Sequence, residues 1–181
     1  LRRHREGPRG VSPTELTCVT PRVHPSTPLD AVVDVPIEVT NNDLEYSDSG
    51  VTFQYRPLPV VGSLWPTSGP VAGGVAVTVE GDGFLEGNTW CSFGDKDAPV
   101  AAAVDHAGAL TCTSPPAVSA EGPVALEVST NAQDWTVSQR WFSYRLPAYV
   151  GDLSPVRGPE RGGTMLTVTG ANFVSSNSLH C

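Results

Sequence analysis

The stretch LWPTSGPVAGGVAVTVEGDGF, residues 64–84, decides the fold class of this chain of 181 residues. Over residues 75–79 valine alternates with alanine and threonine, which is the two-residue period of a strand with one buried face. Glycine and proline stand on both sides of this run, and both residue types form turns. No part of the chain holds a sustained helical period, so we expect short strands joined by turns.

The same pattern returns 89 positions later as LSPVRGPERGGTMLTVTGANF, residues 153–173. A second block repeats as well, because LTCVTP at residues 16–21 matches LTCTSP at residues 110–115. The aromatic sequence FQYR at residues 53–56 likewise matches FSYR at residues 142–145. A repeat of about 90 residues indicates one structural unit copied along the chain.

The repeat sets the expected domain boundaries. Residues 1–58 correspond to the back part of one unit, residues 59–147 to a whole unit, and residues 148–181 to the front part of a third. The chain is therefore expected to begin and end inside a unit. Residues 1–15 have no clear counterpart in residues 94–109, so the strands of that part stay without a prediction.

The complete unit has the pattern of an antiparallel sandwich. Glycine and proline recur at intervals near ten residues, and β-branched residues are abundant between them. Two packed sheets of this kind need about seven strands. Seven candidate strands lie near residues 60–65, 74–80, 88–94, 98–104, 109–113, 123–130 and 139–146.

The four cysteines follow the repeat. Cys91 and Cys112 each fall in an expected strand, and a bridge between them would close a loop of roughly 20 residues, worth ~3 kcal/mol of stability. Two buried free thiols are the alternative. Cys181 aligns with Cys91 and Cys18 with Cys112, so we expect the outer two cysteines to be unpaired. A bridge between Cys18 and Cys181 is topologically possible, but the repeat offers no reason for it.

The charge balance argues against nucleic acid as a partner. The chain has 11 lysines and arginines against 19 acidic residues, a net charge of −8, and the complete unit has three basic residues against nine acids. Such a surface would repel phosphates. The basic cluster Arg2, Arg3, Arg5 and Arg9 is an exception that we interpret as solvated. A membrane-spanning helix needs roughly 18 consecutive apolar residues, and no such run exists in this segment.

Catalytic, metal and cofactor motifs are not found in the sequence. The histidines are too far apart for a metal motif and are expected on the surface, at His4, His24, His106 and His180. The acidic run at residues 41–48 could offer oxygen ligands to Ca²⁺, but it lacks the regular spacing, and a solvated hairpin loop is favoured. We therefore predict no enzyme, no metal and no cofactor.

The tryptophans supply the candidate contact residue. Trp90 and Trp141 fall in expected strands, where we expect them to pack in the core or between the sheets. Trp135 falls in a turn, and an exposed aromatic side chain on a loop would suit a partner contact. A half-buried packing role for Trp135 is equally open.

These residues together resemble the IPT/TIG family, an immunoglobulin-like domain of the early-set type. The resemblance rests on Leu64-x-Pro66 with Gly69-Pro70, on Gly73-Gly74 before a strand, and on Gly81-Asp82-Gly83-Phe84 after it. The segments around Cys91 and Cys112 look like the paired-cysteine form that is common in plexin-like and fibrocystin-like ectodomains. The resemblance covers residues 59–147, with partial matches on both sides. It implies an all-β fold of tandem immunoglobulin-like β-sandwiches, one complete and two truncated.

The resemblance also implies a function. It predicts a non-catalytic structural, adhesion or recognition segment of an extracellular multi-IPT/TIG protein at the cell surface or in the matrix, with any membrane anchor outside this segment. The expected partners are another protein or the extracellular matrix, together with neighbouring IPT/TIG domains of the same chain. The alternatives are an accessory module of a secreted carbohydrate-active enzyme and a Rel-type DNA-binding module. Acidity and paired cysteines oppose the Rel-type module.

Overall fold

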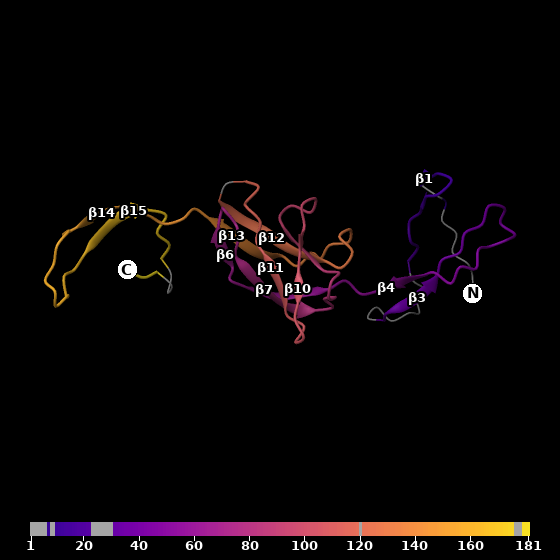
Figure 1. The fold of residues 1–181 in the computed structure, drawn as a ribbon, viewed down its shortest axis with the longest axis horizontal. Coiled ribbons are helices and arrows are strands. Elements are labelled where there is room, and N and C mark those ends of the chain that lie inside the picture. Colours follow the sequence, from indigo (N-terminus) through magenta and orange to yellow (C-terminus); the bar gives the residue numbers. More distant parts are fainter. Residues whose placement is uncertain (1–6, 8–9, 23–30, 120, 176–178) are drawn as a thin grey trace. The chain divides into compact units, whose positions relative to one another are not determined.

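The computed structural model describes all residues except 1–6, 8–9, 23–30, 120 and 176–178. Two of the histidines and the arginine cluster named above lie outside the described residues. The described residues form fifteen β-strands and no helix, so the fold is all-β (Figure 1). Accordingly, no helix in the described part of the chain is long and apolar enough to cross a membrane.

The chain divides into two compact units, Leu1–Pro57 and Leu58–Cys181. The second unit contains a sandwich of two sheets, which we call sheet C and sheet D. Sheet C has the strand order β10-β11-β7-β5 and sheet D the order β6-β13-β12-β8-β9. The strands are β5 (Val60–Trp65), β6 (Ser68–Pro70), β7 (Ala76–Asp82), β8 (Trp90–Phe93), β9 (Val100–Ala101), β10 (Ala103–Val104), β11 (Leu110–Thr113), β12 (Gly122–Ser129) and β13 (Arg140–Arg145).

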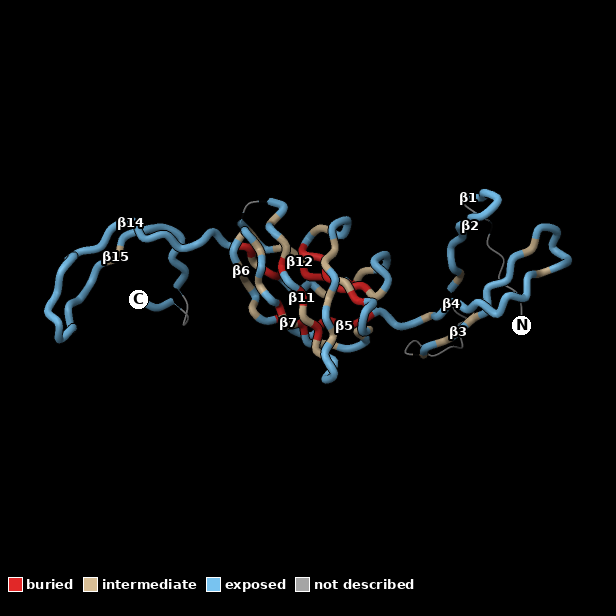
Figure 2. Tube along the Cα trace, in the orientation of Figure 1, coloured by how far each residue is buried: buried red, intermediate tan, exposed pale blue. Residues whose placement is uncertain are grey.

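The core of the sandwich lies between the two sheets (Figure 2). Val77 and Val79 of β7 are fully buried and alternate with residues that point outward, as the two-residue period of this stretch predicts. Phe142 of β13 is fully buried on the other side of the core and makes edge-to-face contacts with Phe93 and Tyr144. The alternating pattern that decided the fold class therefore builds one wall of this core.

Two strands of the sandwich differ from the expected set. The single strand expected at residues 98–104 is divided at Ala102, so that β9 pairs with β8 in sheet D while β10 pairs with β11 in sheet C. The amide of Ala102 donates to the carbonyl of Thr89 at 2.9 Å, which keeps the backbone paired where the chain changes sheets. The short β6 lies in a stretch with turn composition and pairs in parallel with β13. Neither feature changes the hydrophobic period, so the pattern alone could not reveal it.

The C-terminal hairpin repeats the geometry of β5 and β7. It consists of β14 (Tyr149–Ser154) and β15 (Thr167–Ala171), and its register shifts between Val150 and Asp152. The β5–β7 pair shifts at the positions 89 residues earlier, between Val61 and Ser63. A side chain at Gly81 would collide with the carbonyl of Val60, and one at Gly170 would collide with that of Tyr149. The two hairpins therefore share one irregular register.

Two strand pairs lie in the part of the unit Leu1–Pro57 that the structure describes. These are β1 (Gly10–Val11) with β2 (Leu16–Thr17), and β3 (Val33–Pro36) with β4 (Thr52–Tyr55). In the second pair Val33 lies opposite Tyr55, just as Gly122 lies opposite Tyr144 in sheet D.

The β1–β2 pair lies partly in residues 1–15, whose strands the sequence left without a prediction. Gly10 pairs with Thr17 as Ala103 pairs with Thr111, so the two short pairs have similar registers. The turn between the paired strands is one residue shorter here than in the central sandwich. The two stretches therefore differ in length by one residue.

Candidate functional site

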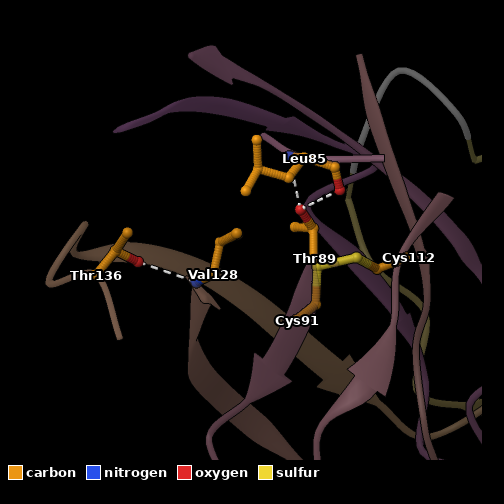
Figure 3. Close-up of a disulfide and its surroundings, with 6 residues drawn as sticks. All are labelled: Leu85, Thr89, Cys91, Cys112, Val128 and Thr136. Carbon is orange, nitrogen blue, oxygen red and sulfur yellow. Dashed lines mark hydrogen bonds between the residues drawn. A yellow bond between two sulfur atoms is a disulfide. The ribbon is translucent and has the colours of Figure 1, made fainter. Parts of the chain in front are cut away.

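A disulfide joins the two sheets of the sandwich. Cys91 of β8 in sheet D is bonded to Cys112 of β11 in sheet C, with a Cα–Cα distance of 6.3 Å, and both side chains are fully buried (Figure 3). The bridge closes a loop of 21 residues, and the chain-entropy model gives such a loop ~3 kcal/mol of stabilisation. Cys18 and Cys181 are free and exposed.

Hydrogen bonds fix the loop that leads into β8. The buried hydroxyl of Thr89 accepts a hydrogen bond from the amide of Leu85 at 2.9 Å and donates one to its carbonyl at 2.8 Å (Figure 3). Thr89 lies two residues before Cys91, so these bonds fix the backbone at the start of the strand that carries the bridge. These hydrogen bonds therefore help to position Cys91 independently of the disulfide.

The loop between β12 and β13 carries Trp135. The side-chain oxygen of Asn131 accepts hydrogen bonds from the amides of Gln133 at 3.0 Å and Asp134 at 2.8 Å, and its amide group donates to the Asp134 carboxylate at 2.8 Å. Ala132 takes a positive φ of 58°, as a tight turn of this kind requires. These bonds define the backbone on which Trp135 stands.

Buried Glu127 attaches the far side of the same loop to the sheet. Its carboxylate accepts hydrogen bonds from the hydroxyl of Thr136 and the amide of Ser138, and the Thr136 hydroxyl also accepts one from the amide of Val128 at 2.9 Å. Figure 3 shows Thr136 against the backbone of Val128. A carboxylate that accepts several hydrogen bonds is well compensated for its burial. Trp135 itself is half-buried. Its loop is held by hydrogen bonds on both sides of this residue.

The register of sheet D corrects the expectation for Trp141. Trp141 lies opposite Ala125, and both point away from the core, because their neighbours Phe142 and Val124 point into it. The Trp141 side chain is 56% exposed, so the expected core packing is wrong. Trp90 is half-buried on the same outward face, opposite Ser129. The alternation around Phe142 and Tyr144 was the sequence signal that could have placed Trp141 outside.

Trp65 is a further exposed aromatic that the sequence did not single out. It closes β5 at the edge of sheet C and pairs with Thr78 of β7. Its neighbour Leu64 points into the core, so the alternation of the strand turns Trp65 outward. The exposed tryptophans therefore lie on both sheets, and the most exposed of them stands on an edge strand.

The next candidates are the histidines and the acidic run. Within the described residues, no three histidine, cysteine, aspartate or glutamate side chains cluster as a metal site would require. In the acidic run, Asn42 accepts hydrogen bonds from the amides of Leu44 and Glu45 at 3.0 Å, which is a turn stabilised by the side chain. Burial raises the pKa of Tyr144, whose hydroxyl donates to the carbonyl of Pro115 at 2.7 Å. The hydrogen bond joins β13 to the segment that follows β11.

Comparison with known proteins matches the central sandwich to one family. The family model of the IPT/TIG domain matches residues 59–144. Among solved structures, the chain is similar to two of the plexin A4 extracellular region. One covers domains 1 to 10, with 18% identity over 59% of this chain and a TM-score of 0.44. The other covers domains 1 to 8, with 19% identity over 51% of this chain and a TM-score of 0.41.

In both cases the chain spans only 9% of the plexin chain. The family match ends at Tyr144, in the last strand of the sandwich, and begins one residue before β5. The described sandwich, with its two packed sheets and the bridge between them, occupies the same residues. Residues 59–144 of this chain are therefore an IPT/TIG domain.

Proposed function

We propose that this chain is a non-catalytic recognition and spacing segment of an extracellular protein built from tandem IPT/TIG domains. The observation that carries the proposal is the disulfide-bridged IPT/TIG domain whose turns and registers recur on both sides of it. Residues 1–58 and 148–181 are then parts of further IPT/TIG domains, with residues 59–147 as the complete one.

Turn geometry supports the assignment of the first part. Asn42 and Asn131 cap equivalent turns, and the residues that follow them, Asp43 and Ala132, both have positive φ angles. The amide of Val39 donates to the Ser47 hydroxyl at 2.8 Å. The Val128–Thr136 bond of the central domain is its equivalent, since each residue stands 89 positions later. Identical side-chain bonds at one fixed offset support a shared domain type.

The disulfide supports an extracellular or cell-surface location. Disulfides persist in oxidising compartments and are rare where thiols are kept reduced. The Cys91–Cys112 bridge is fully buried between two sheets and so belongs to the folded domain. A segment with this bridge suits secretion and exposure outside the cell.

Trp135 is our candidate for the contact with a protein or matrix partner. Its loop is held by Asn131 at one end and by Glu127 at the other. A half-buried aromatic on a preordered loop loses little conformational entropy when it binds.

An adhesion assay tests this function. Beads coated with the chain should attach to cell monolayers or to surfaces coated with extracellular matrix, and Trp135→Ala should lower attachment at least about 10-fold if it removes ~1.4 kcal/mol or more. Val118→Ala is the matched control, because Val118 is exposed and lies outside this loop. Attachment no greater than that of uncoated beads would refute the recognition role, and an unchanged Trp135→Ala variant would refute the role of Trp135.

A further inference from the structure

The edge strands of the central sandwich differ in how much room they leave for a further strand. In the described residues these edges are β10 and β5 in sheet C, and β6 and β9 in sheet D. β9 and β10 have two residues each, and β6 has three and ends at Pro70, whose nitrogen cannot donate a hydrogen bond. β5 has six residues, and no other described strand pairs with its outer side. The outer side of β5 is therefore the edge on which pairing with another strand is best supported.

The side chains of β5 lack the features that usually protect an edge strand. Its two ends are exposed and apolar, since Val60 is 60% exposed and Trp65 is 75% exposed. Between them Val61 and Leu64 are buried in the core, and none of the six residues is charged. Natural edge strands often carry a charged side chain that prevents pairing with another chain. β5 has no such charge and presents apolar side chains instead.

The equivalent strand of the next repeat has a protective residue that β5 lacks. β14 stands 89 positions after β5, and it carries Asp152 where β5 has Ser63. It also ends in Ser154, a small polar residue, where β5 ends in Trp65. The hairpin geometry is shared, so the repeat does not require an uncharged strand that ends in tryptophan. The apolar edge is therefore a feature of the central domain and not of the repeat as such.

The bulge in β5 restricts which strands can pair with it. The register with β7 shifts between Val61 and Ser63, so Gly62 is the extra residue of the strand. A bulge increases the local twist and turns an edge away from a regular strand. A strand with the same bulge at the same level has the same twist and so can follow the edge. A second copy of β5 meets this condition.

We propose that β5 pairs antiparallel with β5 of a second copy of this chain, about a twofold axis perpendicular to sheet C. The strand supports a register centred between its two middle residues, because apolar residues occupy both ends and small residues the centre. The facing pairs are Val60 with Trp65, Val61 with Leu64, and Gly62 with Ser63. Exposed apolar residues then face each other on the outer side, and core-facing residues face each other on the inner side. The contact is isologous, and it rests on the sandwich itself rather than on the proposed function.

The acidic residues beside β5 do not prevent this pairing. Glu80 and Asp82 are exposed on β7, which lies one strand in from the edge. In the paired sheet the two β7 strands would be three strand spacings apart, roughly 14 Å. This separation exceeds the Debye length of about 8 Å at physiological ionic strength, so repulsion between these carboxylates is largely screened. Six residues a side is small against the roughly 20–30 of a standard interface, so the pairing is weak and reversible.

Sedimentation equilibrium of the full chain tests the proposal, in a background of Cys18→Ser and Cys181→Ser that removes the free thiols. The chain should form a reversible dimer at concentrations up to roughly 1 mM, the range that a weak interface requires. Trp65→Ser, which introduces the residue of β14, should raise the dimer Kd at least about 10-fold, because both copies lose an aromatic contact. Trp141→Ser is the matched control, since Trp141 is exposed on β13, which is not an edge strand, and the dimer Kd should stay the same.

A cross-link tests the register. In the same background one chain carries Val60→Cys and the other Trp65→Cys, and the two are mixed with oxidised glutathione. The two thiols bond, and the oxidant takes up their two electrons and two protons to give two molecules of reduced glutathione. The register places the new cysteines opposite each other in the mixed pair, which keeps one native Val60–Trp65 pair at its other end, whereas neither variant alone brings two of them together. The mixture should therefore give at least about 10-fold more covalent dimer than either variant alone.

Three results would overturn the proposal. These are a chain that stays monomeric at every concentration, equal effects of Trp65→Ser and Trp141→Ser on the dimer Kd, and equal covalent yields from the mixture and from either cysteine variant alone. Hydrogen exchange of the same samples identifies a different occupant of the edge. Amides on the outer side of β5 that resist exchange in a monomeric chain would show that a segment of the same chain covers the edge, and would reject the second copy.

Discussion

At the scale of single residues, side chains that link a loop or a sheet edge to the core decide much of the geometry. Glu127 is buried on the outward face of β12 and ties the Thr136–Ser138 segment to the sheet. Tyr144 ties the last strand to the carbonyl of Pro115. Both side chains supply hydrogen bonds to groups that are shielded from water. Removal of either side chain would leave those groups without a hydrogen-bond partner.

Replacement of Glu127 by alanine should lower the free energy of unfolding by about 2–3 kcal/mol, because Thr136 and the amide of Ser138 lose a charged acceptor. Denaturant titration of the full chain measures the change. Glu86→Ala serves as control, since Glu86 is exposed and should change stability by less than about 0.5 kcal/mol. Equal effects of the two substitutions would contradict the role of Glu127.

The buried phenol of Tyr144 should make the domain sensitive to alkaline pH. Burial raises its pKa above the ordinary tyrosine value of 10.0, so the folded state keeps the proton that the unfolded chain begins to lose there. Its contribution to stability is complete below pH 10 and declines as the pH rises through the folded pKa. Unfolding titrations at rising pH should show a weaker decline for Tyr144→Phe than for the wild type, and identical slopes would contradict this.

At the scale of elements, the hairpin β5–β7 depends on a glycine at a close backbone approach. A Cβ at Gly81 would collide with the carbonyl of Val60 and lie 2.8 Å from the ring of Phe84. The approach accompanies the register shift between Val61 and Ser63. Gly170 occupies the same place in β14–β15, so the glycine belongs to the geometry of the repeated hairpin.

Gly81→Ala should therefore destabilise the IPT/TIG domain by about 1–3 kcal/mol, because backbone atoms must move to admit the methyl group. Thermal unfolding followed by tryptophan fluorescence measures the effect. Gly151→Ala is the control, since a Cβ there meets no atom closer than 3.4 Å and should be tolerated. A Gly81→Ala variant as stable as the control would contradict the close approach.

The sequence was informative about elements where a strand alternates and keeps one partner sheet. The period in β7 predicted which valines are buried, and the repeat predicted the cysteine pair. It failed at Ala102, where the chain exchanges sheets without any break in the pattern. It also failed at Trp141, because large aromatic residues suit either face of a strand and only the register with β12 decides between them.

At the scale of the whole molecule, the repeat makes the central IPT/TIG domain a template for the parts beside it. One sandwich carries its own core and its own disulfide. The flanking parts share strand registers and a side-chain hydrogen bond with that sandwich. The proposed assignment of the flanking parts therefore depends on the apolar core and the disulfide of the central domain.

The central claim is that a disulfide between Cys91 and Cys112 joins the two sheets, and the oxidation state of these cysteines tests it most directly. A chain with Cys18→Ser and Cys181→Ser retains only this pair, and it is secreted, unfolded without reductant and treated with an alkylating reagent. We predict no alkylated thiol and an intact mass two hydrogens below that of the reduced chain, as a bridge between the two sheets requires. Two alkylated cysteines in the unfolded chain would contradict the account.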